Sequence, residues 1–334
     1  MKGLMAGIGI LILILDSKTA LSGANSGITL CSQSVIPSIF PFLILTGVLL
    51  PLLSGKQSGM LRPISRLLRI PQGTESIFLM GLLGGYPTGA LMVTQAWKNG
   101  QLKRDDARRM LAFCSNAGPS FLFGILGSKF PNAWMLWVLW LIHIVSAVLT
   151  AVLLPGPHSK FAGNIAAPSV TWTDSLKNAV RTMAYICGWV VFFRVVIAFL
   201  DRWVLWLLPV SARVIVYGIL ELANGCCNLN YIASDGLRFV ICSGILAFGG
   251  VCVMMQTASV TGSLGLGYYL PGKLLQMAFS IILSFIAQMA IFHPTDKMAN
   301  ASFLPVVLSV FIMVFVILRV KMKIRARNPV GVVV

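Results

Sequence analysis

Few ionisable residues interrupt the long apolar stretches of this chain, and each of them is a candidate for chemistry. Glu221 lies in the segment LELANG, and Arg194 lies in the segment VVFFRVVIAF. Charged side chains at membrane depth are costly, so they usually serve a ligand or a partner. We expect Glu221 to bind a coupling proton, a cation, or a substrate hydroxyl or amine. We expect Arg194 to pair with an anionic substrate or with Glu221. The alternatives are a partly wet helix-end carboxylate for Glu221 and a snorkelling side chain for Arg194.

Glycine, proline and short polar residues gather at four interruptions of the apolar runs: GGYPTG (84–89), SNAGP (115–119), ANGCCN (223–228) and FGG (248–250). A helix broken at membrane depth exposes unpaired N–H groups at the start of the next half-helix, which carry the positive end of its dipole. A carboxylate or phosphate is stabilised there. The alternative for any single break is a kinked or closely packed helix. The candidate substrate-binding residues are Gly85, Tyr86, Pro87, Thr88, Ser115, Asn116, Gly118, Arg194, Glu221, Asn224, Asn228, Gly249, Gly250 and Gln256.

Patterns typical of enzymes, metal sites and nucleic-acid binding are missing from the sequence. It has no Ser/His/Asp set, HExxH motif or CxxC pair, and its seven cysteines are scattered. His143 lies on an otherwise apolar segment, which indicates a packing residue. We therefore expect no enzymatic activity, cofactor or metal. The 26 Lys and Arg residues sit mainly in short loops, where they indicate membrane topology and no nucleic-acid partner.

The elements that must position these residues are transmembrane helices, because 57% of the residues are apolar and 10% are charged. A span needs about 20 mostly apolar residues. We predict an all-α polytopic membrane protein with eight spans and two re-entrant hairpins. The first span is interpreted as uncleaved, with a signal peptide as the alternative. The spans are 3–21, 35–54, 106–128, 132–154, 183–207, 236–261, 271–292 and 302–320, and the hairpins are 76–97 and 213–232.

The two hairpins, each followed by a broken helix, predict a duplicated unit. Gly81 aligns with Gly218, and Cys114 aligns with Cys242. The polar turn between the hairpin and the broken helix is shorter in the second copy than in the first. Positive residues collect on the cytoplasmic side, and Lys273 is counted among them. This puts both termini in the cytoplasm. Three spans separate the hairpins, so the first opens to the cytoplasm and the second to the outside, as in the inverted repeats of secondary transporters.

The whole chain, 1–334, is predicted to form one membrane domain. Within it we predict a first repeat at 31–154, a connecting loop at 155–175 and a second repeat at 176–292. A last helix and a basic cytoplasmic tail follow at 302–334. The segment 59–71 alternates Leu or Ile with Arg, which favours a helix on the cytoplasmic surface, with an ordinary basic loop as the alternative.

Five segments in this order resemble the sporulation integral membrane proteins of the YlbJ type, within the nucleoside-recognition Gate-domain group. They are SVIPSIFPFLILTGVLL (34–50), GGYPTGA (84–90), FCSNAGPSFLFG (113–124), LELANG (220–225) and AFGGVCVMMQ (247–256). The resemblance implies a fold like that of concentrative nucleoside transporters. It also implies that the chain moves dipicolinate, a small aromatic dicarboxylate, across a forespore membrane such as the outer one. The chain could do so as a homo-oligomer. The alternatives are a cation-coupled nucleoside transporter and a non-transporting membrane component of sporulation.

Overall fold

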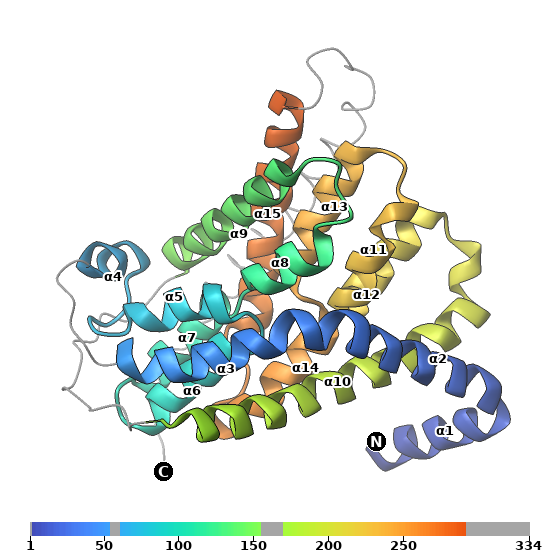
Figure 1. Cartoon of the computed structure of the whole chain (residues 1–334), viewed down its shortest axis with the longest axis horizontal. Helices are drawn as coiled ribbons and strands as arrows, with labels where there is room; N and C mark the ends of the chain where they lie inside the picture. The colour runs from blue at the N-terminus through green and yellow to red at the C-terminus, as the bar shows by residue number, and fades with distance from the viewer. Residues whose placement is uncertain (1, 54–60, 155–169, 292–334) are drawn as a thin grey trace, which may run out of the picture.

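The computed structural model describes residues 2–53, 61–154 and 170–291, and the regular elements in these ranges are helices (Figure 1). A helix satisfies its own backbone hydrogen bonds, which an apolar environment requires. The all-α class is therefore confirmed for this part of the chain, and it is consistent with the predicted polytopic membrane protein. By length and composition, five of its helical stretches are long and apolar enough to cross a membrane: Ser17–Leu49, Ala133–Leu153, Trp172–Trp203, Asp235–Leu264 and Tyr269–Met289.

The N-terminal region departs from the prediction of one span at 3–21. Helix α1 (Lys2–Leu15) ends beside Asp16, whose carboxylate accepts a hydrogen bond from the Thr19 N–H at 3.3 Å and pairs with Arg202 at 3.1 Å. Asp16 thereby caps a new helix, so the single-span prediction is wrong. A long helical stretch follows, which includes the described part of the predicted span 35–54. It consists of α2 (Ser17–Leu30), the π-helical segment Cys31–Val35 and α3 (Ile36–Leu53).

In the first half of the chain, the predicted hairpin 76–97 consists of two short helices of 10 and 11 residues. At about 1.5 Å per residue, each reaches only about half of a 30 Å bilayer core, which suits a hairpin that enters and returns. The predicted broken helix 106–128 is interrupted between Cys114 and Pro119. The helices are α4 (Arg62–Leu68), α5 (Glu75–Gly84), α6 (Thr88–Lys98), α7 (Arg104–Cys114), α8 (Pro119–Leu126) and α9 (Ala133–Leu153).

The second half repeats this order of a hairpin and a broken helix. The predicted break at 248–250 is found at Gly249, whose φ of 81° ends one helix before the next begins. Helix α10 begins at Trp172 because Thr171 and Asp174 form a capping box, so the loop predicted at 155–175 is shorter. The helices are α10 (Trp172–Trp203), α11 (Val210–Leu220), α12 (Leu222–Cys227), α13 (Asp235–Phe248), α14 (Gly250–Thr261) and α15 (Tyr269–Ile291).

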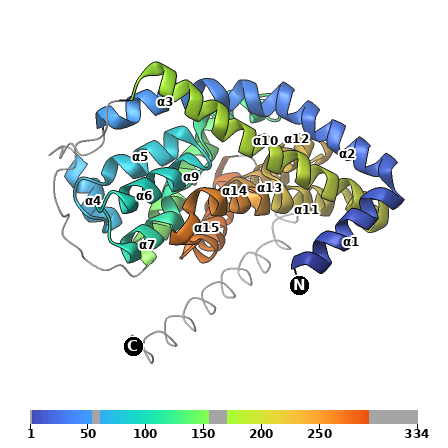
Figure 2. The ribbon, with the colours of Figure 1, turned by 90° about the horizontal axis from the view of Figure 1, so that it is seen from below.

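The helices lie in two directions. Helices α2 and α3 run side by side with α10 along one face, across the direction of α15, as Figures 1 and 2 show. Helices α9 and α13 pack against α15. This arrangement surrounds the first hairpin, so most of α5 and α6 is buried, whereas in α11 of the second hairpin Val214 and Gly218 are the buried residues. The predicted span 302–320 and the basic tail lie outside the described residues.

A pair of glycines lets the two arms of each hairpin approach closely. A Cβ added at Gly81 or at Gly89 would lie 1.8 Å from the Cys114 carbonyl oxygen. In the second hairpin, a Cβ added at Gly225 would lie 2.3 Å from the Gly218 Cα. The aligned positions Gly81 and Gly218 therefore have the same packing role, which supports the predicted duplication.

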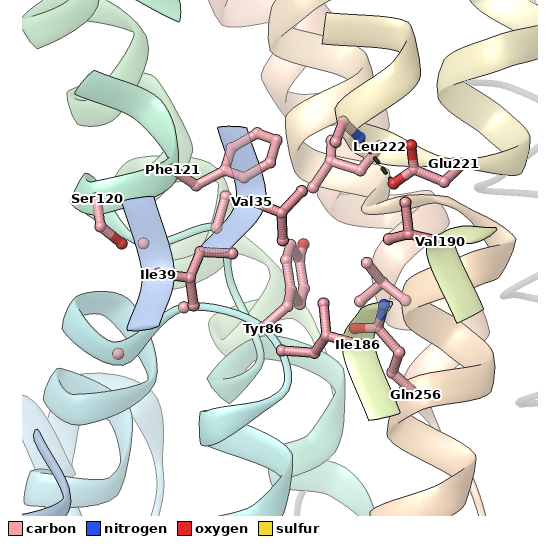
Figure 3. Close-up of a pocket in the computed structure, with 16 residues that line it drawn as sticks. Val35, Ile39, Tyr86, Ser120, Phe121, Ile186, Val190, Glu221, Leu222 and Gln256 are labelled. Carbon is pink, nitrogen blue, oxygen red and sulfur yellow. Dashed lines mark hydrogen bonds between the residues drawn. The ribbon is translucent and has the colours of Figure 1, made fainter. Parts of the chain in front are cut away.

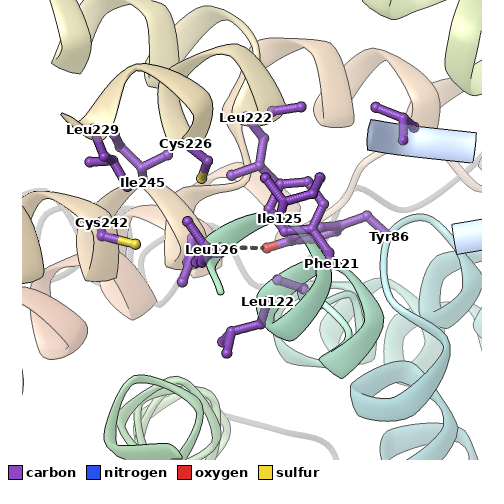
Figure 4. Close-up of a cluster of buried hydrophobic side chains, with 14 of the residues drawn as sticks. Tyr86, Phe121, Leu122, Ile125, Leu126, Leu222, Cys226, Leu229, Cys242 and Ile245 are labelled. Carbon is purple, nitrogen blue, oxygen red and sulfur yellow. Dashed lines mark hydrogen bonds between the residues drawn. The ribbon is translucent and has the colours of Figure 1, made fainter. Parts of the chain in front are cut away.

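Apolar side chains from both halves fill one core cluster around α8, α12 and α13 (Figure 4). Phe121 and Leu122 of α8 meet Leu222 and Cys226 of α12 in this cluster. Tyr86 from the first hairpin belongs to it as well. The second hairpin and the first broken helix are thus held together by apolar burial, which places the two breaks near each other.

Arg109 and Lys273, which the count of positive residues placed on the cytoplasmic side, are both buried within the protein. Arg109 is 2% exposed and donates hydrogen bonds to the carbonyl oxygens of Leu68, Arg69, Ala151 and Leu154 at 2.6–3.3 Å. These carbonyls lie at the C-terminal ends of α4 and α9, where a cation is favoured. The predicted helix within 59–71 is confirmed as α4, and Arg109 attaches it to the core.

Candidate functional site

A pocket lies where the tips of both hairpins meet the break between α7 and α8 (Figure 3). We call it the tip pocket. About 480 Å³ of its space is not filled by atoms, open solvent included, and the room accessible to a water-sized molecule is about 40 Å³. Its walls are mostly apolar and aromatic, with a few polar groups, as is usual for small-molecule sites. The lining residues are Val35, Ile39, Gly84, Gly85, Tyr86, Ala117, Gly118, Ser120, Phe121, Ile186, Val190, Glu221, Leu222, Ala223, Val253 and Gln256.

The first hairpin tip contributes Gly85 and Tyr86 to the tip pocket. Gly85 has a φ of 74°, and an added Cβ would lie 3.1 Å from the Gly118 nitrogen, so glycine is required both for the turn and for the close approach. Pro87 follows through a cis peptide bond. Thr88 starts α6 and donates its hydroxyl proton to the Gly84 carbonyl at 3.2 Å. Pro87 and Thr88 are therefore structural neighbours of the pocket and do not line it.

The break between α7 and α8 is pinned by side chains on both sides. The Asn116 side-chain amide donates to the Phe113 carbonyl at 2.7 Å. The Ala117 N–H donates to His143 Nε2 at 3.1 Å. His143 therefore has more than a packing role, because it accepts a hydrogen bond from the unwound backbone. Gly118 caps α8, and Pro119 is its first residue, so the positive end of α8 borders the pocket as predicted.

Glu221 holds the second hairpin tip together. Its side chain is 2% exposed, and its carboxylate oxygens accept hydrogen bonds from the Ala223 N–H at 2.9 Å and the Asn224 N–H at 2.6 Å. Glu221 thus ends α11 and caps α12. It also lines the tip pocket. Its carboxylate is already engaged by the protein backbone, which favours a structural role over ligand binding.

Lys273 is the functional candidate that the sequence analysis missed. It lies in the first turns of α15, and its side chain is fully buried. Its ammonium donates to the Gln276 side-chain oxygen at 2.7 Å, to the Tyr86 hydroxyl oxygen at 3.3 Å and to the Ser115 carbonyl. A signal was present, because Lys273 and Gln276 stand three residues apart in an apolar helix and so share one face.

A chain of side-chain amides orients the groups around Lys273. Gln276 donates through Nε2 to the Asn116 Oδ1 at 2.9 Å and approaches the His143 carbonyl at 3.4 Å. The Gln276 Oε1 therefore points toward the Lys273 ammonium, and the Asn116 Oδ1 lies 3.4 Å from the Lys273 Nζ. Tyr86 donates its own hydroxyl proton to the Leu246 carbonyl at 3.2 Å. Tyr86 thus stands between the tip pocket and Lys273.

Arg194 does not meet the tip pocket. It is partly buried on α10, where it faces α2: a Cβ added at Gly27 would lie 3.1 Å from the Arg194 Cβ. In the described part of the chain no ion pair joins Arg194 to Glu221. The predicted direct ion pair between Arg194 and Glu221 is therefore not formed, although the Arg194 charge lies close enough to act on Glu221 through space. Pairing of Arg194 with an anionic substrate stays a prediction.

The remaining predicted residues fall into two groups. Gln256 lines the pocket, and Gly249 lies behind it, since an added Cβ at Gly249 would be 2.9 Å from the Tyr86 Cζ. Asn224 and Asn228 are hydrogen-bonded to each other within the second hairpin, with the Asn228 amide 2.7 Å from the Asn224 carbonyl. The structure thus brings both breaks and both tips to one place. Ser115, Asn116, Gly250 and Asn228 lie around this place and do not line the pocket.

The fold defines the class of the molecule as an integral membrane protein with several apolar helices. A curated protein with a similar sequence is the sporulation integral membrane protein YlbJ of Bacillus subtilis (strain 168). It is 27% identical over 115 residues, which are 34% of this chain and only 28% of the relative. No family model and no solved structure matches the chain. Together, the similarity and the apolar helices fit a membrane protein in sporulation.

Proposed function

We propose that this protein transports a small organic anion across a membrane during spore formation, and that dipicolinate is the first substrate to test. The observation that carries the proposal is the uncompensated positive charge beside the tip pocket. The Lys273 ammonium is surrounded by neutral oxygens, and no ion pair with a carboxylate is found for it among residues 2–53, 61–154 and 170–291. A buried charge without a counter-ion attracts an anion strongly.

The walls of the tip pocket suit a flat aromatic acid. Tyr86 and Phe121 offer aromatic faces, and Ile39 and Val253 offer apolar ones. The start of α8 supplies backbone N–H groups at one end of the pocket. A dicarboxylate would place its ring between the apolar walls and one carboxylate toward the α8 terminus. In this proposal, alternating access comes from movement of the hairpins around a fixed site, as in other inverted-repeat transporters.

Two alternatives follow from specific observations. Glu221 lines the pocket, which would suit a nucleoside hydroxyl or a coupling cation. This alternative is weaker because two backbone N–H groups already occupy the Glu221 oxygens. A non-transporting membrane component of sporulation is the second alternative. The name of the similar protein states a sporulation membrane protein and no substrate.

Uptake of radiolabelled dipicolinate into proteoliposomes tests the proposed function. We expect saturable uptake by the full chain and a loss of about tenfold or more in Lys273→Met, which keeps the apolar stem and removes the charge. A tenfold loss corresponds to about 1.4 kcal/mol of lost binding. Lys177→Met is the matched control, since Lys177 is an exposed lysine on α10, and we expect its uptake to equal that of the unmodified chain.

The outcomes separate the three functions. Uridine uptake driven by a sodium or proton gradient, with no dipicolinate uptake, would favour the nucleoside transporter. Absence of flux for dipicolinate, phthalate, succinate and uridine, from a chain that is folded and inserted, would favour the non-transporting component. Equal dipicolinate uptake by Lys273→Met and Lys177→Met would contradict the proposal that the buried charge of Lys273 attracts the substrate.

A further inference from the structure

We propose that the Lys273 ammonium occupies a monovalent-cation site, so that this protein carries a covalently attached cation where a free Na⁺, K⁺ or NH₄⁺ ion would otherwise bind. The site is formed by the first hairpin tip, the break between α7 and α8, and α15. The occupancy of the site is independent of what the protein transports. Its consequence for coupling rests on the proposed transport function.

The ligand set around the ammonium is that of a cation site. Four oxygens lie within reach of Lys273 Nζ: the Tyr86 hydroxyl, the Ser115 carbonyl, and the side-chain oxygens of Asn116 and Gln276. An ammonium has only three N–H donors, so these acceptors exceed what one lysine can satisfy. Hydroxyl, carbonyl and amide oxygens are the ligands that hard cations prefer. Tyr86, which supplies one of the four oxygens, lies 187 residues from Lys273 in sequence.

The position of the site in the fold is also that of a coupling-ion site. The Ser115 carbonyl is freed from helical hydrogen bonding because α7 ends at Cys114. In broken-helix transporters, such unwound carbonyls and the C-terminal ends of half-helices coordinate the coupling cation. The rings of Tyr86 and Tyr269 add attraction, with centroids 5.1 and 6.0 Å from Nζ.

The oxygens are held in place by groups other than Lys273. Asn116 Nδ2 binds the Phe113 carbonyl, and Gln276 Nε2 binds Asn116 Oδ1, so both amide oxygens keep their orientation if the ammonium is removed. The Ser115 hydroxyl is buried and has no hydrogen-bond partner within the described residues, so it is available as a further ligand. Truncating Lys273 would therefore leave a preformed polar cavity that a small cation can enter.

The test measures the thermal stability of the purified full-length chain in detergent at constant ionic strength. The chloride salts of sodium, potassium, ammonium and N-methylglucamine are compared, the last being too large for the site. We expect Lys273→Ala to be stabilised in a saturable way by at least one small cation, by about 2–4 °C in Tm. Lys273→Met is the matched control, because its side chain fills the cavity without charge, and it is expected to show no such shift. The unmodified chain is also expected to show none.

Two results would overturn the proposal. One is a Lys273→Ala protein that folds and shows no cation-specific shift. The other is an unmodified chain that is stabilised by sodium or potassium in a saturable way, because its site should already be filled. If Lys273→Ala fails to fold, the same comparison is made with Lys273→Ser, which leaves the space empty and adds a hydroxyl ligand. If both variants fail to fold, the salt dependence of the unmodified chain is the deciding measurement.

Flux measurements separate this inference from the proposed function. If the protein is a transporter, uptake by the unmodified chain should change less than twofold when N-methylglucamine replaces sodium or potassium. Uptake by Lys273→Ala should depend on the small cation that stabilises it. Cation binding by Lys273→Ala, together with no anion flux by the unmodified chain, would contradict the transport function and uphold the cation site. Anion flux that requires sodium in the unmodified chain would uphold the transport function and contradict the cation site.

Discussion

Two buried charged residues, Glu221 at the second hairpin tip and Lys273 on α15, are stabilised in different ways. Glu221 is neutralised by backbone N–H groups at the start of α12, so its charge completes a helix end. Lys273 is surrounded by neutral oxygens of α15, the first hairpin tip and the break between α7 and α8, and no carboxylate among the described residues pairs with it, so its net charge is not balanced by the protein there. Tyr86 connects the tip pocket to Lys273, because it lines the pocket and its hydroxyl oxygen accepts a hydrogen bond from the Lys273 ammonium.

Glu221→Gln tests the structural role of this carboxylate. We expect a loss of stability of about 1 kcal/mol, because the amide oxygen can keep one of the two backbone hydrogen bonds. Glu221→Ala should lose about 2 kcal/mol or more, since both N–H groups are then left unpaired. Thermal unfolding checks both. Substrate uptake should fall less than threefold in Glu221→Gln, and a complete loss of uptake at unchanged stability would show that Glu221 binds ligand or cation.

At the scale of elements, each hairpin depends on close contact between its two short helices. In the first hairpin this contact is made through Gly81 and Gly89, which both lie against the end of α7. The position of the first hairpin therefore fixes the position of the backbone at the break that begins with Ser115. Packing of small residues is the usual way in which helices approach closely in membranes.

Gly81→Ala is expected to disrupt this contact. The added methyl group would lie 1.8 Å from the Cys114 carbonyl oxygen and 3.0 Å from its carbonyl carbon, so backbone must move. We expect a loss of about 3 kcal/mol or poor assembly, measured by thermal unfolding and size-exclusion chromatography. Gly188→Ala on α10 is the control, because nothing lies within 4 Å of its added methyl group. That variant should be unchanged or slightly more stable, and equal behaviour of the two would contradict the packing argument.

At the scale of the whole molecule, the two halves repeat the order of a hairpin and a broken helix. Each hairpin tip reaches the tip pocket from its own half of the chain. The membrane orientation of the two hairpins remains a prediction from the distribution of positive residues. If the repeat is inverted, the open ends of the hairpins lie on opposite sides of the membrane.

Cysteine labelling tests this inversion. In a variant whose seven cysteines are replaced, Asn99→Cys and Tyr231→Cys mark the open ends of the first and second hairpins, and both positions are exposed. A membrane-impermeant maleimide applied from outside should label Tyr231→Cys at once and Asn99→Cys only after permeabilisation. The cysteine-free parent should remain unlabelled. Labelling of both positions from the same side would rule out the inverted arrangement.

The sequence by itself was sufficient to predict the helical class, the two hairpins and both helix breaks. These features are local, because glycine, proline and asparagine act on the backbone where they stand. Gly85 and Gly249 are found at the breaks with positive φ, as such turns require. The break at Asp16 was missed, because its cap depends on Arg202 from another helix as well as on Thr19.

Only the tertiary structure decided which basic residue lies buried beside the tip pocket. Arg194 and Lys273 both lie in apolar helices, and their sequence surroundings favoured Arg194 as the buried one. The outcome depends on packing between distant segments: Lys273 reaches Ser115 and Asn116 across 158 and 157 residues, whereas Arg194 faces α2. A buried cation is stable in a membrane protein where enough oxygens converge on it, and that convergence is a property of the folded chain.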